Sequence, residues 1–352
     1  MLYKHNSNFL ITLGILSFIC FNSCRETGYK IPKPDVSDIS VDEVKLIRFE
    51  QALFETEGTD PIEHIKSTEE KYPDIFKSYT ENYWSLAQAD SLHPINIYDS
   101  INALVVSNDW MNRLYDSVLL IYNNMDKTEA ELKKAIRYYK YYFPGDTLPQ
   151  FYTYVGPFAY WTMLDDKTLG IELDMFMGEH FGYYGSFENN MPQYITLRCN
   201  ENYIVPNVME TLIDGVIPTK GSDASLLDAM VFKGKVLYYL DLMLPDVPDS
   251  IKIGYTSKQI KWCFDNEDEI WKYLVGEDLL FSKKSDHFRK YLDEAPTSVG
   301  MPEDSPGRVP VWVGWQIIRT YMKEHKDVTL AQLFNEVDGL TLLKESGYNP
   351  EE

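Results

Sequence analysis

The residues that distinguish this chain from an all-helical protein are 150–176, which read QFYTYVGPFAYWTMLDDKTLGIELDMF. Aromatic and β-branched residues gather there in three short runs, at 151–155, 158–163 and 169–176. Turn-forming residues separate the runs, first Gly156-Pro157 and then Asp165-Asp166-Lys167. Because consecutive runs of this kind are typical of strands joined by short turns, we predict a small antiparallel sheet in the middle of the chain.

Helical patterns flank this sheet on both sides. Asp60-Pro61 has the form of an N-cap with a first-turn proline, and residues 128–131 (TEAE) have the form of a capping box. Val44, Ile47 and Leu53 recur at helical spacing. After the sheet, apolar residues recur on one face of the segments 194–199, 203–213, 226–244, 257–264, 267–275, 286–293, 311–323 and 330–337. The predicted fold class is therefore α+β and mostly helical.

The charge of the chain excludes several classes of partner. Its 352 residues include 33 Lys and Arg against 54 Asp and Glu, which gives a formal net charge of −21. Binding a nucleic acid backbone requires clustered cations, so we predict no nucleic acid partner. The same charge argues against docking on anionic lipid through a basic patch. The 44% of hydrophobic residues is typical of a globular protein and excludes disorder of the whole chain.

The first 24 residues predict where the protein resides. Residues 9–21 form an apolar run that is too short to span a bilayer and has the length of a signal-peptide core. Cys24 follows almost directly, as in a bacterial lipoprotein signal, where the cysteine becomes the first mature residue and is acylated. An ordinary secreted protein cleaved near Ser23 and an uncleaved anchor helix are the alternatives. We predict a signal peptide at 1–23 and lipidation of Cys24.

The mature chain is predicted to contain a tether and one domain. Residues 24–39 include two prolines and show no periodicity, which favours an acylated, extended tether. Residues 40–352 contain no repeat and no linker rich in Pro, Gly or Ser, so we predict a single α+β domain there. Its two cysteines, Cys199 and Cys263, make one disulfide conceivable and exclude a disulfide framework.

The sequence lacks the usual catalytic motifs. None of its six histidines are spaced as in the H-E-x-x-H zinc helix, and no C-x-x-C is present. G-x-S-x-G, the Walker-type phosphate loop and G-x-G-x-x-G are also missing. These routine nucleophile, phosphate and zinc sites are therefore not supported.

Two segments could still carry a site, and the first contains Glu172, Asp174 and His180. On a strand the two carboxylates would share one face, with His180 in the loop that follows. Together they could hold a metal ion or act in acid-base chemistry. The commoner explanation is a strand edge that faces solvent, since any half-exposed strand alternates in this way.

The second segment begins a helix after Pro306-Gly307. Arg308 and Arg319 are unusual in so acidic a chain, and Trp315, Gln316 and Arg319 lie within one helical turn of each other. The arginines could hold a carboxylate ligand, but an internal ion pair with one of the many acids is the commoner arrangement. Tryptophan on a helix is likewise more often core than a binding platform.

Parts of the leader and body together resemble a known family. The matching residues are Cys24, 170–178 (GIELDMFMG), 226–239 (LLDAMVFKGKVLYY), 306–308 (PGR) and 314–317 (GWQI). They are similar to the GldB family of gliding-motility lipoproteins from Bacteroidetes bacteria, and the likeness runs through essentially the whole chain. That family looks distantly related to zincin-like metallopeptidases. The resemblance therefore implies a zincin-like domain.

The resemblance also implies that the metal has been lost. In the place of the zinc helix, residues 202–209 read NYIVPNVM, which offers no ligand type except Asn. Lys233 precedes Gly234 where a zincin has its third ligand, a glutamate, and an ammonium repels Zn²⁺. We therefore expect no catalytic residue, no metal, no cofactor and no enzymatic activity.

By resemblance, the protein is a membrane-anchored lipoprotein of the cell envelope involved in gliding motility. It would act by binding other envelope or gliding-machinery proteins, in the inner or the outer membrane. One alternative is an atypical metal-dependent, peptidase-like hydrolase that uses Glu172, Asp174 and His180. Another is a glycan-binding or peptidoglycan-binding lipoprotein, which would need several tryptophans lined up on the surface.

Overall fold

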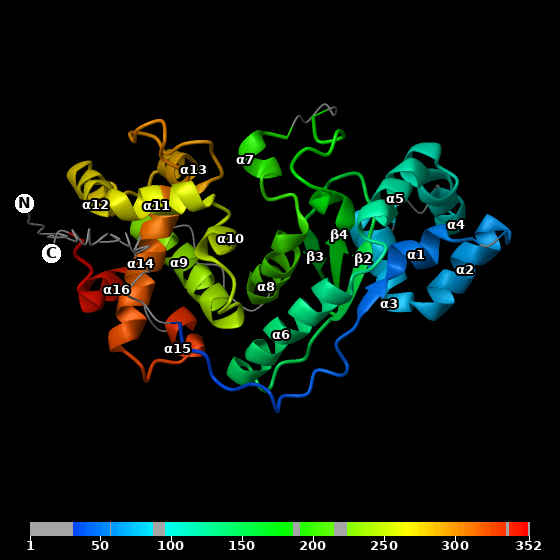
Figure 1. The fold of residues 1–352 in the computed structure, drawn as a ribbon, viewed down its shortest axis with the longest axis horizontal. Helices are drawn as coiled ribbons and strands as arrows, with labels where there is room; N and C mark the ends of the chain where they lie inside the picture. The colour runs from blue at the N-terminus through cyan, green and yellow to red at the C-terminus, as the bar shows by residue number, and fades with distance from the viewer. Residues whose placement is uncertain are drawn as a thin grey trace, which may run out of the picture. The chain divides into compact units, whose positions relative to one another are not determined.

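The strands expected at 150–172 are present, but they pair differently from the prediction. In the computed structural model, the sheet has the order β1-β2-β4-β3 (Figure 1). Its strands are β1 (Leu46–Arg48), β2 (Gln150–Tyr154), β3 (Thr162–Leu164) and β4 (Thr168–Glu172). β2 is parallel to both β1 and β4, whereas β3 and β4 are antiparallel. The predicted antiparallel sheet is therefore wrong, and the sheet is mixed.

The connections between the strands explain this pairing. Residues 155–161 do not continue β2 or begin β3, because their backbone N–H groups bind two buried carboxylates. β3 is therefore short, and it turns back onto β4 at Asp165, whose side chain accepts hydrogen bonds from the backbone of Lys167 and Thr168. β1 reaches β2 through a long helical crossover, as parallel strands require.

The structure describes residues 31–56, 58–86, 96–185, 191–214, 224–335 and 338–350. The predicted signal peptide, Cys24 and residues 25–30 of the predicted tether lie outside the described residues. Within the described part of the chain, no helix is both long and apolar enough to cross a bilayer.

Helices fill the crossover between β1 and β2. They are α1 (Phe49–Phe54), α2 (Pro61–Lys71), α3 (Pro73–Lys77), α4 (Ile97–Ile101), α5 (Asp109–Ile121) and α6 (Asp126–Tyr142), with π-helical turns at Ser78–Tyr83 and Asn102–Val106. Asp60 caps α2 as predicted, accepting hydrogen bonds from the backbone N–H groups of Ile62 and Glu63. The capping box at 128–131 is wrong, because α6 begins earlier and Glu129 instead accepts from the backbone of Leu46.

The helical spacing of Val44, Ile47 and Leu53 predicted a helix at the start of the domain, and this prediction is wrong for residues 46–48. Residues 46–48 form β1, and α1 begins only at Phe49. Three residues are too few to show the alternation by which a strand is recognised.

The C-terminal half confirms the expected mostly helical character. Its helices are α7 (Gln193–Thr196), α8 (Ile204–Asp214), α9 (Leu226–Met243), α10 (Asp249–Ile253), α11 (Ser257–Asp265), α12 (Glu267–Gly276), α13 (Ser285–Leu292), α14 (Val309–Glu324), α15 (Leu330–Asn335) and α16 (Gly339–Ser346). Short 3₁₀ turns cover Leu173–Phe176 and Glu201–Tyr203.

α9 and α14 form the centre of this half and lie side by side (Figure 1). Two glycines face each other where they cross. A Cβ atom on Gly234 would lie 2.4 Å from the carbonyl oxygen of Gly314, and one on Gly314 would lie 2.2 Å from that of Met230. The two backbones therefore approach closely only because both positions lack a side chain.

Candidate functional site

Glu172 ends β4, and Asp174 lies in the 3₁₀ turn that follows. Both carboxylates point into the loop between β2 and β3. Asp174 accepts hydrogen bonds from the backbone N–H groups of Gly156 (2.8 Å) and Phe158 (3.0 Å). Glu172 accepts from those of Ala159 (3.0 Å) and Tyr160 (2.6 Å). The two acids therefore hold this loop in place.

Tyrosine hydroxyls complete the surroundings of Glu172. Tyr83 donates to one carboxylate oxygen at 2.9 Å, and Tyr154 to the other at 3.4 Å. Neither Glu172 nor Asp174 is exposed to solvent. The solvent-facing strand edge expected for this pair is therefore wrong, because the strand ends at Glu172 and the turn directs Asp174 inward.

Burial changes the ionisation of both acids. It raises the pKa of Glu172, and burial together with repulsion from Glu172 raises that of Asp174 well above its usual value. A carboxyl whose pKa is higher in the folded state binds more protons there than in the unfolded chain. The pair therefore lowers the stability of the fold as the pH rises above about 4, the usual carboxyl pKa.

The loss of stability with rising pH leads to a prediction for Asp174→Asn. Between pH 5 and pH 8 the wild type should lose more unfolding free energy than the variant, because asparagine has no proton to release. Over this interval the difference is about 1.4 kcal/mol for each unit by which the folded pKa exceeds 5. Urea titrations at several pH values measure it. Asp166→Asn, at an exposed position, should keep the wild-type profile; parallel profiles for wild type and Asp174→Asn would contradict the assignment.

His180 does not complete a metal site with these acids. Its side chain is exposed, whereas both carboxylates are buried and engaged by backbone donors. Among the described residues, no group of three His, Cys, Asp or Glu side chains could hold a metal ion. Cys199 and Cys263 are both buried and not joined in a disulfide.

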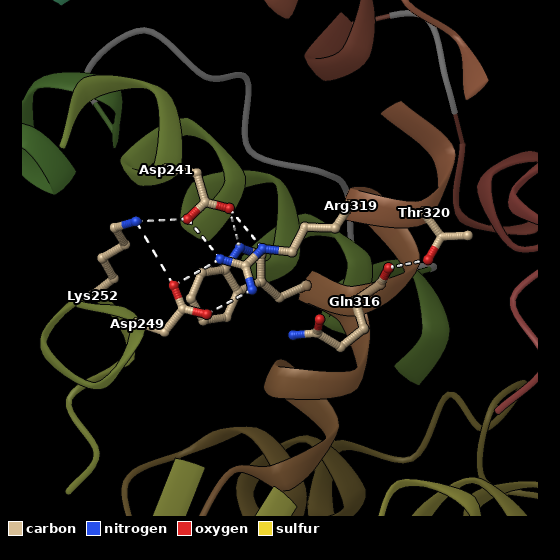
Figure 2. A network of polar contacts seen from close by, with 7 residues as sticks. Asp241, Asp249, Lys252, Gln316, Arg319 and Thr320 are labelled. Carbon is tan, nitrogen blue, oxygen red and sulfur yellow. Dashed lines mark hydrogen bonds and ion pairs between the residues drawn. The ribbon is translucent and has the colours of Figure 1, made fainter. Parts of the chain in front are cut away.

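Arg319 is held in an internal network, the commoner arrangement expected for it (Figure 2). Its guanidinium donates to Asp241 through Nε and Nη2, each at 2.8 Å, and to Asp249 through Nη1 at 2.7 Å and Nη2 at 2.9 Å. Lys252 donates to Asp241 at 2.8 Å. The side chains of Asp241 and Lys252 are fully buried. The network ties α14 to α9 and α10.

Trp315 and Gln316 lie on the same buried part of α14. The indole N–H of Trp315 donates to Asp241 at 3.0 Å, and the guanidinium of Arg319 stacks 3.7 Å from the centre of its ring. Gln316 is 7% exposed, and its side-chain Nε2 has no hydrogen-bond partner in the described structure. Trp315 and Arg319 therefore form part of the core and offer no open ligand site.

Arg308 and Lys233 lie instead on a cavity of about 520 Å³, which we call the α8–α9 cavity. Asn207, Glu210, Thr211 and Asp214 line it from α8, and Lys233 lines it from α9. Its remaining walls include β3, the segment before it, and the residues Arg198, Lys252, Glu294 and Arg308. The cavity thus collects charges from distant parts of the sequence.

Two of the predicted residues therefore meet here, together with five charged residues that the sequence analysis missed. Arg198 and Arg308 each bind the same oxygen of Glu294 at 3.0 Å. Glu210 and Asp214 are exposed residues, although the protein atoms packed around their carboxyls partly desolvate them and raise the pKa of each. The i, i+4 spacing of Glu210 and Asp214 on one face of α8 was a usable signal. Nothing in the sequence links Arg198 to Glu294.

The tryptophans do not form an exposed platform. Trp312 and Trp315 are buried, and the other five, Trp84, Trp110, Trp161, Trp262 and Trp271, are half-buried. A glycan-binding surface built from several exposed tryptophans is therefore not supported.

Comparison with known proteins identifies one family. A family model described as gliding motility protein GldB matches residues 30–350. No curated protein and no solved structure matches the chain.

Proposed function

The chain belongs to the family of the gliding motility protein GldB, and from this premise we propose that it is an acylated lipoprotein of the cell envelope that binds other proteins and catalyses no reaction. The family match runs through almost the whole described chain and makes the protein a gliding-motility-related lipoprotein. Cys24, directly after an apolar leader segment, supports acylation as the means of attachment.

The observation that carries the non-catalytic proposal is the position of Lys233. The resemblance to zincins pairs the zinc helix with a third ligand on a later helix. Asn207 of α8 and Lys233 of α9 line the same cavity, in agreement with that arrangement. If the resemblance holds, an amide and an ammonium replace the metal ligands of a peptidase, and the ammonium repels a divalent cation. This supports a zincin-like scaffold that has lost its metal.

The two acids of the alternative hydrolase site, Glu172 and Asp174, are already bound by the backbone. All four carboxylate oxygens of Glu172 and Asp174 accept backbone N–H groups. Freeing either acid for a metal or a substrate would leave buried donors without partners, at a cost of about 1–3 kcal/mol for each. We therefore assign this pair to the support of the loop between β2 and β3.

Replacing Cys24 with serine tests the anchor. We expect Cys24→Ser to move the protein from the membrane pellet to the soluble fraction, because the acyl chains supply the attachment. Cys20→Ser is the matched control, since it changes the other leader cysteine and should leave the protein in the membrane. Ultracentrifugation of cell lysates measures both. A Cys24→Ser protein that remains in the pellet would show that the leader or a partner holds it.

The same pair of variants tests binding to envelope proteins. Cross-linking in living cells should join the Cys20→Ser protein to envelope proteins, and these products should decline for Cys24→Ser because the protein no longer lies at the membrane. Identical cross-linked products from both variants would contradict a role that depends on anchoring.

A further inference from the structure

The α8–α9 cavity contains charges that the protein does not neutralise by direct contact. Within the described ranges, the carboxylates of Glu210 and Asp214 and the ammonium of Lys233 form no hydrogen bond or ion pair. All three residues are exposed, so their charges are accessible to a charged ligand that enters the cavity.

One end of the cavity has a surplus of positive charge. Arg198 and Arg308 share the single carboxylate of Glu294, and their side chains are only 19% and 15% exposed. The Nε atom of Arg198 is buried and has no hydrogen-bond partner in the described structure. Its guanidinium lies 5.6 Å from the centre of the Trp161 ring, which also lines the cavity. This end can therefore accept a further carboxylate.

Glu210 and Asp214 lie one turn apart on α8, and both line the cavity. Neither acid is directly paired in the described structure, so this wall of the cavity can accept a cationic group.

The length of the cavity limits the size of the ligand. Its wall on α8 runs from Asn207 to Asp214, a separation of about 10 Å at the rise of an α-helix. The two charges of a single α-amino acid are much closer together than this. An extended peptide advances roughly 3.3–3.6 Å per residue, so about three residues span this distance. A volume of about 520 Å³ lies within the usual range for ligand sites.

We propose that the α8–α9 cavity binds a short peptide by both of its termini. The peptide carboxylate lies against Arg198 and Arg308, and the ammonium lies near Glu210 and Asp214. Glu210 and Asp214 repel a ligand with only negative charges. This inference goes beyond the proposed function, because it requires neither the anchor nor a role in motility.

Tripeptide pools provide the probe. The detergent-solubilised full-length protein is labelled with 5-fluorotryptophan, and the fluorine signal of Trp161 is assigned with Trp161→Phe. Four pools of Ala-X-Ala, with X uncharged, are titrated: free at both ends, acetylated at the N-terminus, amidated at the C-terminus, and blocked at both. We expect the free pool to shift the Trp161 signal and to leave those of buried Trp312 and Trp315 in place. Blocking either end should weaken binding about tenfold or more, as for the loss of a charge-assisted hydrogen bond.

Two variants test which residues of the cavity bind each terminus of the peptide. Arg198→Met should reduce the difference in affinity between the free and the amidated pools, because one of the two arginines that bind the carboxylate is gone. Asp214→Asn should reduce the difference between the free and the acetylated pools, because Glu210 is then the only acid left to bind the ammonium. Arg113→Met and Asp116→Asn, at exposed positions of α5, are the matched controls and should bind like the wild type. The fluorine signals of Trp312 and Trp315 report whether each variant is folded.

Two results would overturn the proposal. The first is a Trp161 signal that none of the pools shifts at millimolar concentration. The second is equal binding of the free and the doubly blocked pools. If Arg198→Met fails to fold, Asp214→Asn still decides the question, because its side chain is exposed to the cavity and belongs to no ion pair in the described structure.

Discussion

Asp241→Asn is expected to lower the free energy of unfolding by about 3–5 kcal/mol, the usual cost of removing one partner from a buried ion pair. Asp241 is fully buried and faces two buried cations, Arg319 and Lys252 (Figure 2). Asparagine keeps the shape of the side chain but removes its charge. Asp249 would then be the remaining acid of the network for both cations. Urea titration followed by far-UV circular dichroism measures the change.

Asp246→Asn is the matched control for this prediction. Asp246 also pairs with two cations, Lys33 and Lys134, but its side chain is 50% exposed. Water screens pairs of this kind, so the control should lose less than about 1 kcal/mol. Equal losses in the two variants would show that the buried network does not stabilise the packing of α9, α10 and α14.

Gly314→Ala is expected to destabilise the protein by about 3 kcal/mol or more, at the upper end of the range for overpacked cores. The added Cβ would lie 2.2 Å from the carbonyl oxygen of Met230, a backbone atom that cannot rotate away. α9 and α14 would have to separate, and contacts along both helices would loosen. Thermal and urea unfolding of the variant measure the loss.

Gly276→Ala provides the control on another helix. Gly276 is the last residue of α12, and a Cβ there meets no atom within 4 Å. Alanine is the better helix former, so stability should stay the same or rise by up to about 1 kcal/mol. A loss at Gly276 as large as that at Gly314 would contradict the explanation by close helix approach.

Some local signals in the sequence predicted local structure correctly, whereas the capping box at 128–131 did not. Asp60 caps α2 as expected, because an N-cap depends on residues two and three positions away. The strands at 150–172 were also recognised from their composition. Their pairing was not, because the backbone of the loop after β2 binds Glu172 and Asp174, and no local pattern shows that contact.

Some residues of the candidate site could also be selected from the sequence, whereas others could not. Lys233 and Arg308 were selected from the sequence, one from the resemblance and one as an unusual arginine, and both line the cavity. Arg198 and Glu294 were missed because their contact joins residues almost a hundred positions apart. Long-range ion pairs of this kind depend on how the helices pack.

Residue type and spacing were sufficient to predict the acidic charge, the α+β class and the helix-rich body. These properties depend on composition and on neighbours within one or two turns of chain. Tertiary packing determined the mixed order of the sheet, the burial of Asp241 and Arg319, and the cavity along α8. Packing alone brings distant charges together and removes water from around them, and that loss of water sets which charges must be paired.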